Sequence, residues 1–175
     1  MANEVFDAVR TVLAVREYQD KALPPGLMRR VVDAARLTAS ASNRQPWHFV
    51  LIEDREALRE MGHLVRTGPY IASAAAAVVV AVDKGNPLAV SDASRAIQSM
   101  ILTAWAEGVG SNWVGFLHGL QGVGPLLGIP EEVDVLAILP FGYPVQNIGS
   151  GIKKRKPLGE VAHREKWGQP FAPSA

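Results

Sequence analysis

Cysteine is absent from this chain of 175 residues. Without thiols, the sequence excludes disulfide bonds, thiolate metal sites and cysteine nucleophiles. Long apolar runs are missing as well, because proline, glycine or a charged residue interrupts each one before the roughly 18 residues that a membrane span needs. The first residues carry acidic side chains and no basic segment leading into an apolar run, unlike a secretory signal. We therefore expect a soluble, cytoplasmic protein with no membrane partner.

An excess of charge of one sign is also lacking, since 18 basic and 17 acidic residues give a formal net charge of +1. Domains that bind nucleic acid commonly have a broad basic face and a pI above about 9, whereas this sequence has a pI near 8.1. The basic residues are unevenly distributed, because residues 153–156 read Lys-Lys-Arg-Lys. A small phosphate is a more economical partner for this cluster than a nucleic acid.

The hydrophobic content of 48% allows a core to form without disulfides or structural metal, and we expect one domain over residues 1–175. Apolar residues at helical spacing, and short β-branched and aromatic runs, predict a mixed α/β fold. The expected helices cover residues 4–15, 27–37, 54–65, 92–107 and 120–127. The expected strands cover residues 47–53, 76–82, 111–116 and 133–139.

Two of these helices have recognisable ends, and one has a clear apolar face. Asp54 is expected to cap the helix that follows it, and Gly108 to end the helix at 92–107. In the first helix, Val5 and Val9 share a face that we expect to be buried against a neighbour.

Residues 149–175 carry glycine, proline and charge without a steady period, which predicts an extended C-terminal arm. Such an arm is usually disordered when free. Trp167 and Phe171 are apolar anchors, so we expect it to pack, on its own subunit or on another.

The segment richest in chemistry joins an expected helix to an expected strand. Residues 38–47 read Thr-Ala-Ser-Ala-Ser-Asn-Arg-Gln-Pro-Trp. Small side chains let a planar ligand approach the backbone, and the amides of Asn43 and Gln45 can donate and accept hydrogen bonds, as a pyrimidine-like edge requires. A polar loop capped by serine and asparagine has a similar composition, which by itself favours that simpler interpretation.

The same segment resembles the Pro-Ser-x-x-Asn-x-Gln-Pro-Trp motif of the nitroreductase-like flavoproteins, with Ala39 in place of the first proline. The resemblance implies an α+β fold with a central, mostly antiparallel sheet flanked by helices. It implies a homodimer with exchanged C-terminal arms and FMN at the subunit interface. It further implies that Ser40, Asn43 and Gln45 reach the flavin of the opposite subunit and hydrogen-bond to its isoalloxazine and ribityl groups.

A second segment, Leu-Ala-Val-Arg-Glu-Tyr at 13–18, resembles the family's Arg-Ser-x-Arg-x-Phe. Arg16 and the aromatic Tyr18 are retained, whereas Leu13 and Ala14 stand in place of the first arginine and the serine. Arginine can form two charge-assisted hydrogen bonds to a phosphate, so the resemblance assigns Arg16 to the FMN phosphate. Without the resemblance, an arginine at a helix end is more simply explained by the helix dipole.

A third segment, Lys-Lys-Arg-Lys-Pro-Leu at 153–158, resembles a basic segment ending in Arg-x-Pro-Leu that serves the phosphate in the same family. Alternate residues of an extended chain point to one side. Lys153 and Arg155 are therefore the predicted phosphate ligands. The alternative is a solvated basic run, which we expect to describe Lys154 and Lys156.

A fourth segment, Gly-Val-Gly-Ser-Asn-Trp-Val-Gly at 108–115, is similar to the family's Gly-Leu-Gly-x-x-Trp-x-Gly stretch beside the flavin. Trp113, Val114 and Gly115 are the cofactor contacts that it implies. Lacking a side chain, Gly115 can bring its backbone N–H close to the ring. Residues 139–144 resemble the family's Leu-Pro-x-Gly-Tyr-Pro strand end, which we interpret as architecture.

The implied activity is that of an FMN-dependent NAD(P)H oxidoreductase, which reduces nitroaromatic, quinone or similar electron-poor acceptors by ping-pong hydride transfer. No catalytic side chain is needed, because the flavin carries the electrons. Arg66 is placed near the pyrimidine end of the ring. The sequence does not choose between NADH and NADPH as electron donor, and it does not name the physiological acceptor.

Several alternatives stay open at this point. The chain could store flavin without turnover, or be a specialised relative that fragments flavin, dehalogenates or oxidises azolines, or bind phosphate through the basic arm alone. The four histidines lack His-x-x-x-His spacing, and Ser40 and Ser42 lack a Gly-x-Ser-x-Gly context. The sequence therefore predicts neither a metal site nor a hydrolase triad.

Overall fold

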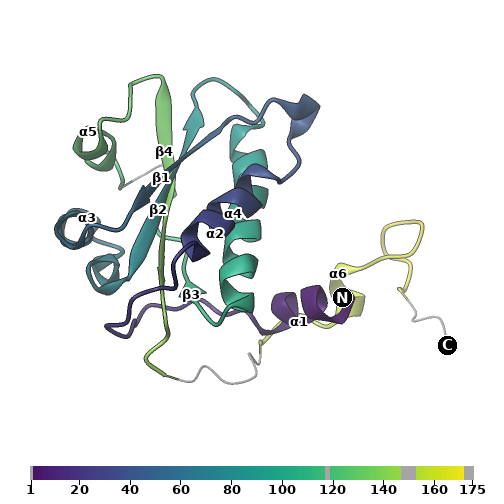
Figure 1. The fold of residues 1–175 in the computed structure, drawn as a ribbon. Coiled ribbons are helices and arrows are strands. Elements are labelled where there is room, and N and C mark those ends of the chain that lie inside the picture. The colour runs from purple at the N-terminus through teal and green to yellow at the C-terminus, as the bar shows by residue number, and fades with distance from the viewer. Residues whose placement is uncertain (1, 117–118, 147–152, 172–175) are drawn as a thin grey trace.

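A computed structural model describes residues 2–116, 119–146 and 153–171, and Figure 1 traces the chain. The helices are α1 (Ala2–Thr11), α2 (Leu27–Arg36), α3 (Arg55–Leu64), α4 (Ala89–Ala106), α5 (Val123–Leu127) and α6 (Leu158–Val161), with short 3-10 turns η1 (Ala41–Asn43) and η2 (Pro69–Ser73). The strands are β1 (Trp47–Ile52), β2 (Ala76–Asp83), β3 (Gly110–Ser111) and β4 (Val133–Gly142). In this part of the chain, no helix is both long and apolar enough to span a membrane.

One antiparallel sheet with strand order β1-β2-β4-β3 forms the centre of the fold. β2 is buried along its length from Ala76 to Val82, because both of its edges are paired and both of its faces are covered. The β-branched and small residues of this run suit such a position. The expectation of a mixed α+β fold with an antiparallel sheet is confirmed.

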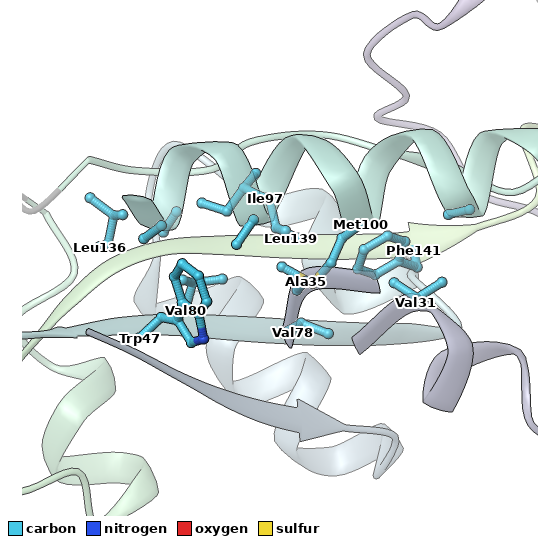
Figure 2. Packing of buried hydrophobic residues seen from close by; sticks show 14 of the residues in the cluster. Val31, Ala35, Trp47, Val78, Val80, Ile97, Met100, Leu136, Leu139 and Phe141 are labelled. Atoms are coloured by element: carbon cyan, nitrogen blue, oxygen red, sulfur yellow. The ribbon is translucent and has the colours of Figure 1, made fainter. Parts of the chain in front are cut away.

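The two faces of the sheet carry different helices (Figure 1). α2 and α4 cover one face, and α3, α5 and η2 cover the other. The alternation of a strand sends Val78 and Val80 to the first face and Val79 to the second. On the first face, Ile97 and Met100 of α4 extend from the helix toward the sheet (Figure 2). α4 is therefore a fixed part of the core against which loops can be positioned.

Local signals placed several element boundaries correctly. The Asp54 side chain accepts a hydrogen bond from the Ala57 backbone N–H at 2.9 Å, which confirms the predicted cap of α3. Gly108, at φ +76°, follows the end of α4 in the left-handed conformation.

Two predicted elements are shorter than expected. The first helix ends at Thr11, because the chain then turns to bridge β3 at Ala14, and Val15 donates its backbone N–H to the Ser111 carbonyl at 2.9 Å. The predicted strand at 111–116 was also too long, since β3 contains only Gly110 and Ser111. Val114 rejoins the sheet as a single bridge to Ile138, after which Gly115 turns with φ +74°.

The expectation that Val5 and Val9 are buried was wrong for the single chain, because their side chains are 66% and 45% exposed. α1 and α6 project together from the body of the protein, as Figure 1 shows. Trp167 is 90% exposed in the single chain, and its ring lies 4.3 Å from that of His163 between centroids. Among the described residues, these apolar side chains are thus exposed on the projecting part of the chain.

Candidate functional site

The loop between α2 and β1 has an unusual and well-defined backbone. Ser42, Asn43 and Gln45 all have positive φ, at 50°, 54° and 51°. Non-glycine residues in this region of conformational space are uncommon, and asparagine tolerates it better than most. Three such residues within four positions mark a segment whose conformation is imposed by its surroundings.

Hydrogen bonds within the loop support this conformation. Ser40 Oγ accepts from the Gln45 backbone N–H at 2.9 Å, and Gln45 Nε2 donates to the Asn43 carbonyl at 3.2 Å. Asn43 and Gln45 are exposed, and Ser40 is half-buried. The loop therefore presents polar side chains to the surroundings while its own backbone is largely satisfied.

A buried carboxylate from α4 is attached to the same loop. Asp92 is 1% exposed, and its Oδ2 accepts from the Ala41 backbone N–H at 3.0 Å. Sequence reasoning missed this residue, because Asp92 was interpreted only as the start of a helix. The available signal was an acidic residue on the same helical face as Ala96 and Met100, both of which are buried.

Arg16 lies at the far end of α4, next to β3. The segment around it is fixed by hydrogen bonds from its backbone to β3 and to the chain after β4: Val15 N–H donates to Ser111, and the Glu17 carbonyl accepts from Val145 N–H at 3.1 Å. Arg16 itself is exposed and lines an open depression of about 230 Å³. The other lining residues are Ala14, Val15, Glu17, Pro144 and Gln146.

The basic segment of the C-terminal arm returns to the N-terminal helix. Lys153 Nζ donates to the Val9 carbonyl of α1 at 2.5 Å, while Arg155 Nη1 donates to the Lys154 carbonyl at 2.9 Å. Partial burial, followed by the nearby charge of Arg155, lowers the pKa of Lys153 below its ordinary value.

Trp113, Val114 and Gly115 run beside β4. Trp113 Nε1 donates to the Gly115 carbonyl at 2.6 Å, and Val114 exchanges backbone hydrogen bonds with Ile138 at 2.9 Å each. A Cβ at Gly115 would lie 2.6 Å from Leu120 Cδ1, so packing within the chain already demands glycine here. Arg66, the residue placed near the ring by sequence, is exposed in the connection between α3 and η2.

Two of the predicted site segments lie at opposite ends of α4. The loop group, Ser40, Asn43 and Gln45, is attached near Asp92 in the first turn of the helix. The Arg16 segment joins β3, just beyond the last turn of the helix. At a rise of about 1.5 Å per residue, the two ends are separated by roughly 20 Å.

Solved structures share this architecture over nearly the whole chain. An FMN-dependent nitroreductase from Clostridium difficile superposes with a TM-score of 0.84 at 21% sequence identity, covering 93% of this chain and 99% of that one. A putative NADH dehydrogenase/NAD(P)H nitroreductase from Parabacteroides distasonis gives a TM-score of 0.85 at 24% identity, covering 94% and 99%. The class is therefore the nitroreductase-type α+β fold.

The sequence places the chain more narrowly within that class. The family model "Nitroreductase family" matches residues 10–86 and 63–143. A relative named putative NADH dehydrogenase/NAD(P)H nitroreductase from Archaeoglobus fulgidus is 31% identical over 172 residues, covering 94% of this chain and 99% of its own. One of the same name from Methanothermobacter thermautotrophicus is 32% identical over 154 residues, covering 84% and 81%. The chain belongs to the nitroreductase family.

Proposed function

We propose that this chain is an FMN-dependent NAD(P)H oxidoreductase that works as a homodimer with FMN between the subunits. The observation that carries the proposal is the separation of the two residue groups along α4. Within one chain, the loop at 40–45 and the segment around Arg16 are separated by most of the length of that helix. This separation supports a site in which the loop at 40–45 is contributed by a second chain.

The donor set fits a phosphorylated, planar, polar-edged cofactor. Arg16, Lys153 and Arg155 supply three cations for the phosphate, although Glu17 lines the same depression as Arg16 and offsets part of its charge. Arginine and lysine are the usual partners of a phosphate. With Lys153 and Arg155 added, the Arg16 end of the proposed site carries a net positive charge, which favours an anion.

The loop at the other end suits the ring. The side chain of Asn43 is exposed on the loop, and Gln45 retains an acceptor oxygen after donating through Nε2. A Ser40 hydroxyl that accepts from Gln45 N–H still has a proton to donate. Such mixed donors and acceptors match the edge of an isoalloxazine and the hydroxyls of a ribityl chain.

The exposed apolar residues supply a dimer surface. On the projecting helices and the arm, the side chains of Val5, Phe6, Leu158, Val161 and Trp167 are between 60% and 90% exposed. A second copy of the chain would remove this surface from water, which is the dominant favourable term in association. Exchange of the C-terminal arms between the two chains would bury Trp167, the most exposed of these residues.

When bound, FMN would supply the electron chemistry, taking a hydride from NADH or NADPH and reducing an electron-poor acceptor such as a nitroaromatic or a quinone in a second half-reaction. The residues of the chain would bind, orient and enclose the flavin. Arg16, Lys153 and Arg155 would hold the phosphate, the opposite subunit's loop would hold the ring edge, and the backbone beside Trp113 and Val114 would line the ring. The names of the relatives, with NAD(P)H and nitroreductase in them, support this activity.

The decisive experiment is a denaturing extraction of the purified protein combined with sedimentation. We expect about one FMN per chain, a dimer, and oxidation of NADH or NADPH that depends on an added nitroaromatic or quinone. A monomer that stays colourless with excess FMN would contradict the proposal. A yellow dimer that shows no turnover would support the FMN site and the dimer but contradict the proposed activity.

A further inference from the structure

The contact between Asp92 and the loop at 40–45 connects the rigid core to the proposed flavin loop. In the part of the chain that the structure describes, Asp92 is the only side chain from outside residues 40–45 that hydrogen-bonds to the backbone of this loop. Its other oxygen pairs with Arg95, one turn further along α4. From this geometry we infer that Asp92 is a positioning residue, which holds the loop in the conformation that presents its side chains to the flavin of the partner subunit.

The carboxylate is well suited to this role. Asp92 lies in the first turn of α4, where the helix dipole stabilises negative charge. Arg95 contributes a second stabilising charge, although its own side chain is 51% exposed. A hydrogen bond from the Ala41 N–H to a charged carboxylate is stronger than one to a neutral acceptor. The bond to Ala41 is therefore a fixed point rather than a surface contact.

The loop needs such a fixed point. Ser42 and Gln45 have no intrinsic preference for positive φ, and residues in this conformation persist only where the surroundings over-determine them. The internal hydrogen bond between Ser40 Oγ and Gln45 N–H closes the loop on itself but does not attach it to the core. Asp92 attaches the loop at Ala41, directly next to Ser40.

A second contact holds the preceding residues without reaching the loop. Thr38 and Ser99 share a hydrogen bond between their hydroxyls at 2.8 Å, two turns further along α4 than Asp92. This bond holds the exit of α2, whereas Asp92 holds the loop itself at Ala41. The two contacts can thus be separated by mutation.

The effect of Asp92 on FMN binding rests on the proposed function, whereas its effect on the loop does not. Two measurements keep these two effects distinct. The first is the hydrogen-exchange rate of the Ala41 amide in the protein without flavin. The second is the affinity for FMN, titrated by quenching of flavin fluorescence. Asp92→Ala removes the acceptor, Asp92→Asn keeps an oxygen that can accept from Ala41, and Ile97→Ala weakens α4 at a buried position of the core away from the loop.

We expect Asp92→Ala to speed exchange at Ala41 at least tenfold and to weaken FMN binding about tenfold. Asp92→Asn should restore both to within about threefold of the wild type. Ile97→Ala should lower the melting temperature at least as much as Asp92→Ala while leaving FMN affinity within about threefold.

Three results would overturn the inference. Unchanged Ala41 exchange in Asp92→Ala would show that the loop does not depend on the carboxylate. Faster exchange with unchanged FMN affinity would show that this contact does not serve flavin binding, and an equal loss of affinity in Ile97→Ala would reduce Asp92 to a general stabilising residue. A wild-type protein that binds no FMN is a separate failure, which refutes the proposed function, while the exchange rates still decide whether Asp92 positions the loop.

Discussion

The two ends of α4 differ in how much of the proposed site exists before a ligand arrives. At the first end, the loop at 40–45 is closed by its own hydrogen bonds and attached to buried Asp92. At the other end, Arg16 is exposed, and Lys153 rests on a backbone carbonyl of α1. One end of the proposed site is preorganised, and the other depends on long cationic side chains that a bound ligand would have to order. Affinity gained at the preorganised end costs less conformational entropy.

This contrast has a direct chemical test, because FMN and riboflavin differ only in the phosphate. Changes at the cationic end should affect FMN alone, whereas changes at the loop should affect both flavins equally. The ratio of the two affinities therefore reports which end of the site has been altered.

The largest effect is expected for the double substitution Lys153→Gln and Arg155→Gln. Each loses a charge-assisted interaction with the phosphate, worth about 1 kcal/mol when exposed, so FMN affinity should fall about 30-fold or more. Riboflavin affinity should stay within about threefold, as measured by the same fluorescence titration. Lys154→Gln with Lys156→Gln removes equal charge from the same segment and is the matched control. An equal loss in both double variants would show that only the general charge of the arm matters.

A smaller effect is expected at the loop. Asn43→Gly removes the amide while tolerating the positive φ of 54°, so the backbone need not change. Loss of one hydrogen bond to the ring should weaken FMN and riboflavin alike, by about tenfold. Asn43→Ala also removes the amide but keeps a Cβ at this φ, so it serves as a comparison for backbone strain. A variant that weakens FMN but spares riboflavin would move Asn43 to the phosphate end.

The sequence predicted the core of the fold better than its edges. The strand at Trp47 and the cap at Asp54 depend on local patterns, and both were found as expected. The exposed face of α1 was mispredicted because helical spacing shows that Val5 and Val9 share a side, but not whether the rest of the same chain covers that side. Amphipathicity alone cannot distinguish a core from a subunit interface.

The site was predicted as a set of segments rather than as an arrangement. Motif resemblance identified the residues of the loop and the cations of the arm, and these assignments stay predictions. It could not show that the loop and Arg16 lie at opposite ends of one helix, because that separation is set by the packing of α4 against the sheet. Asp92 was missed because its partner is a backbone N–H fifty-one positions away in the chain, and no local pattern encodes such a contact.

A gain of affinity is expected where this chain departs from the family pattern. Ala14 lines the depression beside Arg16, where the family motif has a serine. Ala14→Ser adds a hydroxyl that can donate to the phosphate, and the position is exposed, so the substitution should cost little stability. FMN affinity should rise about threefold to fivefold, with riboflavin unchanged, as shown by paired titrations. An Ala14→Cys variant, of similar size but a weak donor, should not reproduce the gain.

The smallest effect is a pH dependence at the cationic end. Partial burial and the nearby Arg155 lower the pKa of Lys153, so this ammonium loses its proton at a lower pH than an ordinary lysine. The phosphate binds the protonated form and raises the pKa of Lys153 in the complex, so FMN affinity should fall as the pH rises from the pKa of the free protein toward that of the complex.

Lys153→Arg stays charged throughout and should flatten this decline, while riboflavin affinity shows no such trend in either protein. Titrations at several alkaline pH values would measure the difference, expected to be about twofold to threefold. An identical decline in Lys153→Arg would assign the titrating group to another residue and leave Arg155 and Arg16 as the principal phosphate ligands.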